Sequence, residues 1–215
     1  MHAHQKQCGA ARAYQSRQRK RLAILLIGVV VSALEGYGGR HESHSLFLQS
    51  DAGHVGIEAL MVGLSMYVDA ITAGKPHTRR LLFAVDAYIK GALLVALAMF
   101  IGADALMRAA KPPEVLTGPL LTYAVIGLVG NVVQFLLNLS IPHEHAGHHG
   151  FTLHLAMDIG QSVAIIGECF LIEATGWPGW DMLLAALVAL IFAPMGALIV
   201  RRGRREYVND QSHPH

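Results

Sequence analysis

Charged residues are scarce in this chain: Asp, Glu, Lys and Arg make up only 15% of its 215 residues. Soluble globular domains carry about 25% of such residues, so the composition disfavours a soluble fold. Cysteine is scarcer still, since only Cys8 and Cys169 occur and neither has a partner in a CxxC motif. A disulfide framework is therefore not expected. The formal net charge of +2 is small and gives no indication of a nucleic-acid partner.

Hydrophobic residues make up 53% of the chain and occur in six long blocks. Blocks of about 20 apolar residues match the hydrocarbon core of a bilayer, and a segment that crosses it must satisfy its own backbone hydrogen bonds as a helix. Three of the connectors contain glycine and proline, which end helices. The sequence thus predicts an all-α, polytopic membrane protein with six transmembrane helices. They are expected at residues 22–39, 46–73, 81–107, 116–141, 151–175 and 182–200.

Lysine and arginine are distributed unevenly between the two sides that six spans would define. Thirteen of the 17 fall in the two terminal segments and in the connector at residues 75–80, whereas Arg40, Arg108 and Lys111 fall on the opposite side. The positive-inside rule then places both termini in the cytoplasm. We expect the protein itself in the inner or plasma membrane of a cell. Residues 1–21 and 201–215 are expected to be short basic cytoplasmic tails on either side of a membrane domain at residues 22–200.

Two of the predicted spans each carry a histidine and a carboxylate four residues apart. They are His54 with Glu58 in the second span and His154 with Asp158 in the fifth. Residues at i and i+4 project from one face of a helix. Two such pairs facing one another would supply two imidazole nitrogens and two carboxylate oxygens, a tetrahedral set that suits zinc. Because ionisable groups inside a membrane usually mark a pathway or a site, we favour a metal site over a purely structural polar network.

Other ionisable groups also lie inside the predicted spans. Asp51 lies one turn before His54, and we favour an accessory role for it. It could orient His54 as a hydrogen-bonded carboxylate, accept a proton, or line a wet vestibule. The role of Glu35 is left open. Asp86 and Lys90, at i and i+4, are expected to form an ion pair within one helix.

Histidines also cluster in the predicted connectors. The connector between the fourth and fifth spans contains His143, His145, His148 and His149. This group could collect metal at the cytoplasmic side, or it could be a plain polar loop. On the opposite side, His41 and His44 are candidates for an exit-side binding point.

Several stretches resemble the membrane domain of the cation diffusion facilitator family of zinc transporters, and the match runs along nearly the whole chain. The stretches are ALEGYGG, SHSLFLQSDAGH, MRAAKPPEV, IGLVGNVV, LHLAMDIGQSVAIIG and TGWPGWD. The resemblance implies a six-helix domain that exports divalent cations from the cytoplasm in exchange for protons, by alternating access, usually as a homodimer. It also implies that the transported metal binds to His54, Glu58, His154 and Asp158.

The sequence departs from the family pattern in two ways. Glu58 stands where the family has aspartate, and the longer side chain could loosen the geometry or bind a larger ion with both oxygens. Members of the family usually continue after the sixth span into a cytoplasmic domain that binds metal and aids dimerisation. Since no such domain follows Arg205, we expect the transmembrane part alone, with dimer contacts through the membrane helices.

The predicted function is therefore that of a transporter and not of an enzyme, with divalent metal ions, protons and membrane lipids as its partners. Zn²⁺ is the expected substrate, and Cd²⁺, Co²⁺, Fe²⁺ and Mn²⁺ are left open, although two histidines argue against manganese. A membrane sensor or scaffold that binds metal without moving it is an alternative. A di-iron oxidoreductase would require several histidine boxes on one side of the membrane, whereas His41 and His44 are predicted on the side opposite to His145 and His148.

Overall fold

The fold is a bundle of long helices, as the hydropathy pattern predicts. The computed structural model describes residues 2–72, 76–141 and 147–212, and no strand occurs among them. The helices are α1 (His2–Tyr37), α2 (Leu46–Ile71), α3 (Pro76–Ala109), α4 (Thr117–Leu139), α5 (Gly147–Thr175) and α6 (Gly179–Ser212), and a π-helical turn η1 (Gly38–Glu42) follows α1. Each of the six contains a segment long and apolar enough to cross a membrane. The prediction of a six-helix, all-α membrane protein is confirmed.

The helices extend beyond the predicted spans into polar segments. The first helix begins at His2 and the last ends at Ser212, whereas the apolar blocks predict spans at residues 22–39 and 182–200. Hydropathy marks only the part of a helix that crosses hydrocarbon. The polar segment before residue 22 contains no proline and is rich in Ala, Gln, Arg and Lys, which are good helix formers, so the helix continues through it. The fifth helix likewise begins at Gly147, inside the predicted histidine loop.

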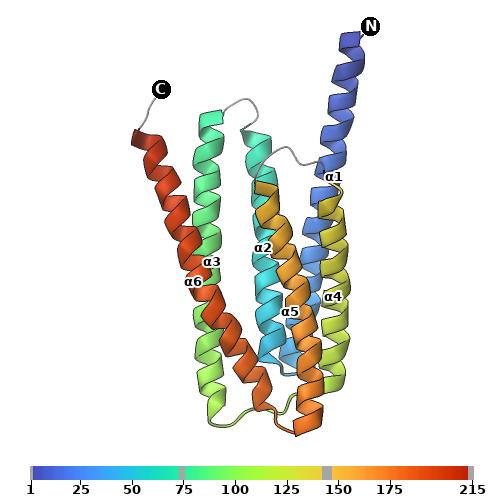
Figure 1. Ribbon diagram of the computed structural model, residues 1–215, viewed down its shortest axis with the longest axis vertical. Helices are drawn as coiled ribbons and strands as arrows, with labels where there is room; N and C mark the ends of the chain where they lie inside the picture. Colours follow the sequence, from blue (N-terminus) through green and yellow to red (C-terminus); the bar gives the residue numbers. More distant parts are fainter. Residues whose placement is uncertain (1, 73–75, 142–146, 213–215) are drawn as a thin grey trace.

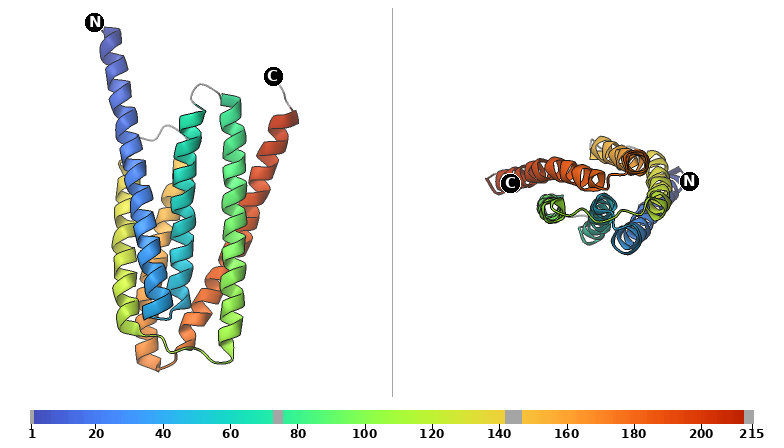
Figure 2. Two further views of the ribbon diagram at one scale, coloured as in Figure 1. Left: turned by 180° about the vertical axis from the view of Figure 1, so that it is seen from behind. Right: turned by 90° about the horizontal axis from the view of Figure 1, so that it is seen from below.

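The bundle has two parts that Figures 1 and 2 show clearly. Helices α1, α2, α4 and α5 form one group, and α3 and α6 lie side by side next to it, in contact chiefly with each other. Both termini lie at the same end of the bundle, as an even number of spans requires (Figure 1). Small residues explain the close contact of α3 with α6. A Cβ atom added at Gly91 would lie 2.6 Å from the carbonyl oxygen of Gly196, so the two backbones touch, as small residues in membrane helices allow.

The start of α2 is fixed to the start of α6 by the buried carboxylate of Asp181. Its oxygens accept hydrogen bonds from Ser45 Oγ at 2.6 Å and from the backbone N–H groups of Leu46 at 2.8 Å and Phe47 at 3.0 Å. The Ser45 hydroxyl in turn accepts a bond from the N–H of Leu48 at 3.0 Å. The first N–H groups of a helix have no partner within it, so Ser45 and Asp181 together cap α2.

Apolar residues from several helices form the buried core at the end opposite the termini, and polar residues occupy the centre. The apolar core includes Leu46, Phe47, Leu94, Ile101, Leu120, Ile165 and Phe192. The fully or nearly fully buried polar side chains include Glu35, Asp51, His54, Glu58, Asn131, Asp158, Ser162, Glu168 and Asp181. Burying so many polar groups is costly unless they are paired or serve a function. The bundle therefore encloses a polar centre that packing alone does not explain.

Candidate metal centre

Two helices bring the four predicted site residues together. Helix α2 carries His54 and Glu58, and α5 carries His154 and Asp158. The i, i+4 spacing directs both side chains of each pair to the same face, and the two faces meet inside the bundle. His54 is 3% exposed, Glu58 6% and Asp158 1%, whereas His154 is only partly buried.

Three of the four residues, His54, Glu58 and His154, bring their ligand atoms close to one another, and Asp158 joins them through a contact with His54. Nε2 of His54 is 3.9 Å from Oε1 of Glu58 and 3.3 Å from Oδ1 of Asp158. Nε2 of His154 contacts Oε1 of Glu58 directly, and the ring centroids of His54 and His154 are 5.0 Å apart. One ligand atom from each of His54, Glu58 and His154 fits within a mutual distance of 4.8 Å. The spacing in the sequence correctly predicts the proximity of these side chains, and metal binding by them stays a prediction.

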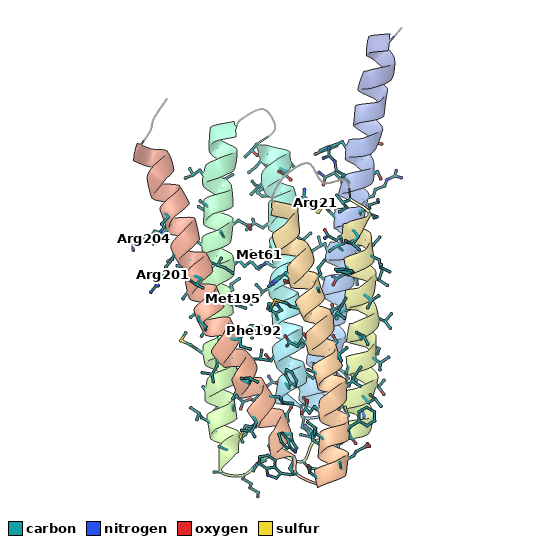
Figure 3. The ribbon with its side chains drawn as sticks, viewed as in Figure 1. Arg21, Met61, Phe192, Met195, Arg201 and Arg204 are labelled. Carbon is teal, nitrogen blue, oxygen red and sulfur yellow. The ribbon has the colours of Figure 1, made fainter. Side chains whose placement is uncertain are left out.

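Helix α6 covers one side of the cluster. The ring of Phe192 stacks on that of His54 with the centroids 4.4 Å apart and the planes at 24°. Figure 3 shows Phe192 and Met195 on α6 and Met61 on α2, near the middle of the molecule's length. Met61 follows Glu58 by one turn and is buried as well. An apolar cover of this kind keeps bulk water from the imidazole and so strengthens its electrostatic interactions.

Lys90 of α3 is a fifth member of the site, although its spacing from Asp86 predicts an ion pair within α3. Its Nζ atom lies 4.0 Å from Oε1 of Glu58. The expected ion pair with Asp86 is absent within the same distance, although both side chains belong to the described part of the chain. The rotation of α3 about its axis directs Lys90 towards α2, and a sequence alone does not give that rotation. The general rule that an intramembrane lysine marks a functional site could have identified it.

Asp51 lies next to Glu35 and forms no hydrogen bond with the imidazole of His54. The two carboxyl groups are close enough for a hydrogen bond if one of them carries a proton. Within the described part of the chain, Nδ1 of His54 and both Asp51 oxygens lack a hydrogen-bond partner. The structure therefore does not show the hydrogen bond by which Asp51 could orient the imidazole of His54. The accessory role of Asp51 stays a prediction, and Glu35 joins it as a second buried acid beside the site.

Helix α4 packs closely on this acidic pair and on α5. A Cβ atom at Gly127 would lie 1.8 Å from Oε1 of Glu35, so only glycine leaves room for that carboxyl group. One turn further along α4, Asn131 Nδ2 donates a hydrogen bond to Ser162 Oγ at 3.1 Å, and Ser162 Oγ donates to the carbonyl oxygen of Asp158 at 3.2 Å. These bonds fix α5 against α4 at the level of Asp158.

The remaining candidate histidines lie away from the cluster or outside the described residues. His41 is exposed in η1, with its ring 5.3 Å from that of Tyr37, and His44 is exposed with φ 61°. Among the described residues, neither belongs to a group of three potential ligands. His143 and His145 lie outside the described residues, and His148 and His149 lie in the first turn of α5 with side chains that are not described.

Comparison with known proteins gives a consistent result. The family model for the cation efflux transmembrane domain matches residues 21–206. The chain is 28% identical over 179 residues to the zinc transporter ZitB of Pectobacterium atrosepticum, a match that covers 80% of the chain and 56% of that protein. It is 29% identical over 187 residues to the cadmium, cobalt and zinc/H(+)-K(+) antiporter of Bacillus subtilis, covering 84% of the chain and 57% of the relative.

A third relative is the metal cation efflux system protein CzcD of Cupriavidus metallidurans, which is 26% identical over 187 residues, with 84% of the chain and 58% of that protein covered. The chain thus spans somewhat more than half the length of the curated relatives that it matches.

Proposed function

The chain belongs to the cation efflux family, and on that premise we propose that it exports Zn²⁺ from the cytoplasm in exchange for protons, by alternating access. Membership of the family supports a transporter of divalent cations and not an enzyme. The relatives are named as transporters of zinc or as antiporters of cadmium, cobalt and zinc. The choice of Zn²⁺ and the exchange for protons are our extensions to this chain.

The observation that carries the proposal is the buried cluster of His54, Glu58 and His154, with Asp158 against His54. Two imidazole nitrogens and two carboxylate oxygens suit the tetrahedral geometry and intermediate softness of Zn²⁺. Cd²⁺ and Co²⁺ fit the same donor set, and Fe²⁺ fits it as well. Mn²⁺ prefers oxygen ligands and is the least suited of these ions.

The chemistry of the cluster couples metal binding to proton release. Zinc binds neutral imidazole and ionised carboxylate, so the entry of the ion requires protons to leave. Histidine can take those protons back near neutral pH, which makes His54 and His154 suitable proton carriers. Protons that arrive from the far side then displace zinc, and the proton gradient drives net export. The site lies within the membrane-crossing parts of α2 and α5, as alternating access around a central site requires.

We also propose that both termini face the cytoplasm and that two copies associate through their membrane helices. The first proposal rests on the excess of lysine and arginine at the end of the bundle that holds the termini. Labelling single cysteines placed near each terminus with an impermeant reagent in intact cells tests the orientation. Mass photometry of the purified chain in detergent tests the dimer.

A flux assay in liposomes tests the transport proposal. Protein is reconstituted with a zinc indicator inside, and zinc is added outside with the lumen either acidic or at the outer pH. We expect an acidic lumen to accelerate uptake. His154→Ala and Asp158→Ala should each abolish uptake, whereas Glu173→Gln, an exposed carboxylate on the same helix, should leave it unchanged.

Three outcomes would contradict the proposal in different ways. Uptake that ignores the pH gradient would reject the proton exchange. Undiminished uptake in both the His154 and Asp158 variants would reject the site. Zinc that binds the purified protein with no flux in liposomes would indicate a membrane sensor or scaffold.

A further inference from the structure

A groove with a basic mouth and an apolar interior lies at the end of the bundle opposite the termini. The mouth is a cavity of about 650 Å³ between η1, α2 and α3, whose lining includes Arg40, His44, Asp104, Arg108 and Lys111. A second hollow of about 320 Å³ adjoins it deeper between α1, α2 and α3. The two hollows share Arg40, Gln49 and Phe100, so they form one continuous groove.

The mouth carries two uncompensated positive charges. Arg108 pairs with Asp104 at 2.8 Å and donates a hydrogen bond from Nη1 to the carbonyl oxygen of His44 at 2.9 Å. Asp104 is the only acidic residue among those that line the mouth. Arg40 and Lys111 are exposed, and neither forms an ion pair within 4.0 Å in the described part of the chain. An anion is therefore the ligand that the mouth favours, whereas a metal cation is repelled.

The interior of the groove is lined mainly by apolar residues. Its polar residues Ser32 and Gln49 donate hydrogen bonds to main-chain carbonyl oxygens. Gly36 and Ala52 form its floor, and Phe100 forms its wall.

Leu97 closes the inner end, since a Cβ atom added at Gly53 would lie 2.7 Å from Leu97 Cδ1. A Cβ atom added at Gly36 would meet only the Cβ of Ala52, at 3.8 Å, so the groove is not filled by neighbouring side chains at this point. A small hydrophilic anion would leave this half of the groove empty.

The length of the groove matches one leaflet of a bilayer. Arg108 lies at its mouth and Leu97 lies in its interior, eleven residues apart on α3. This separation corresponds to a rise of about 16 Å along the helix. Half of the hydrocarbon core of a bilayer is about 15 Å thick. A ligand with an anionic group at Arg40 and an acyl chain directed inwards would therefore follow the ordinary depth of a lipid in that leaflet.

We propose that this groove is a binding site for one anionic phospholipid, with the phosphate group at Arg40 and Lys111 and one acyl chain along Gly36 and Phe100. Paired cations at the membrane surface attract anionic headgroups, and the apolar interior discriminates a lipid from free phosphate. The site is separate from the metal cluster, so the proposal does not depend on what the protein transports.

Native mass spectrometry of the full chain in detergent tests the proposal directly. The probes are dioleoyl phosphatidylglycerol, dioleoyl phosphatidylcholine and inorganic phosphate. We expect one saturating adduct of phosphatidylglycerol. The double variant Arg40→Gln/Lys111→Gln should weaken its binding by about tenfold to 30-fold, since two cations no longer face the headgroup. The matched control Arg204→Gln/Arg205→Gln removes two exposed cations near the other end of the bundle and should bind like the parent.

A second pair of variants tests the apolar half of the groove. Gly36→Leu should fill the interior and weaken phosphatidylglycerol binding. Gly167→Leu, at an exposed position of α5 with nothing within 4 Å of an added Cβ, should not weaken it. Equal binding of phosphatidylglycerol by the parent and by Arg40→Gln/Lys111→Gln would overturn the proposal. So would equal affinity for phosphatidylcholine, or displacement of the adduct by inorganic phosphate together with no effect of Gly36→Leu.

Discussion

Ser45 donates a hydrogen bond to Asp181 at 2.6 Å across 136 positions of sequence, and this contact joins the first turn of α2 to the first turn of α6. Asp181 also accepts bonds from two backbone N–H groups of α2. His54 and Glu58 lie further along the same helix. The contact therefore fixes the position of the helix that carries two of the four proposed metal ligands.

Asp181→Ala should destabilise the protein strongly. The substitution leaves the Ser45 hydroxyl and two helix N–H groups buried without their acceptor, at a cost of about 2–4 kcal/mol. Thermal unfolding in detergent measures the loss. Asp104→Ala removes a partly exposed carboxylate that pairs with Arg108, and it should change the free energy of unfolding by less than about 1 kcal/mol. Similar losses in the two variants would mean that the buried cap contributes no more to the free energy of unfolding than the exposed ion pair does.

Gly127→Ala should disturb the acidic pair beside the site. The new methyl group would lie 1.8 Å from Oε1 of Glu35, so Glu35 or α4 must move. Overpacking of this kind costs about 1–3 kcal/mol. Gly118→Ala lies on the same helix with nothing within 4 Å of the added Cβ, and it should be neutral or slightly stabilising because alanine is the better helix former. Thermal unfolding of both variants tests this prediction, and equal melting temperatures for Gly127→Ala and Gly118→Ala would contradict it.

Glu58→Asp should shift metal preference towards smaller ions. The shorter side chain withdraws the carboxylate by one methylene and disfavours binding of a larger ion by both oxygens. The ratio of Cd²⁺ to Zn²⁺ affinity should therefore fall by about threefold to tenfold, while zinc still binds. Competition between the two ions in isothermal titration calorimetry measures the ratio. A ratio that is unchanged or increased would show that side-chain length at this position does not set selectivity.

Lys90→Met should tighten zinc binding. The ammonium group lies 4.0 Å from Oε1 of Glu58, where it both attracts the carboxylate and repels a dication. Removing one charge so close to the site should strengthen zinc binding by about tenfold. Lys90→Arg keeps the charge and serves as the control, with an affinity close to that of the parent. Weaker binding in Lys90→Met would indicate that the lysine instead maintains the geometry of Glu58.

Zinc affinity should fall as the pH is lowered. Protons compete with the metal for the imidazole nitrogens of His54 and His154, so acid favours the metal-free form. With both rings as ligands, the dissociation constant should rise by up to about a hundredfold per pH unit on the acidic side. His154→Ala should reduce this slope to about tenfold. A dissociation constant independent of pH between 5.5 and 8, measured by calorimetry, would exclude histidine ligands.

The fold and the centre of the site were largely predictable because both depend on local spacing. Runs of about 20 apolar residues specify a spanning helix, and the i, i+4 pairs at His54 and His154 specify a shared face. The extended ends of α1 and α6 were missed, since hydropathy does not register a helix that continues into water.

Contacts between helices were predicted least well. The orientation of Lys90 towards Glu58, the stacking of Phe192 on His54 and the proximity of Asp51 to Glu35 depend on helix rotation and depth. No periodicity in a single sequence encodes these quantities. The Ser45–Asp181 cap was not predicted either, because a capping residue is normally sought next to its helix and not 136 positions away.

The contact between Gly91 and Gly196 has a mechanical consequence. The carbonyl oxygen of each residue lies within 3 Å of where a methyl group of the other would begin, so no side chain separates the backbones of α3 and α6 at this level. Sliding one helix past the other would bring main-chain atoms into collision at this point, so we expect α3 and α6 to move together. Phe192 lies on α6 one turn before Gly196, so we expect a movement of this helix pair away from α2 to lift Phe192 from the ring of His54.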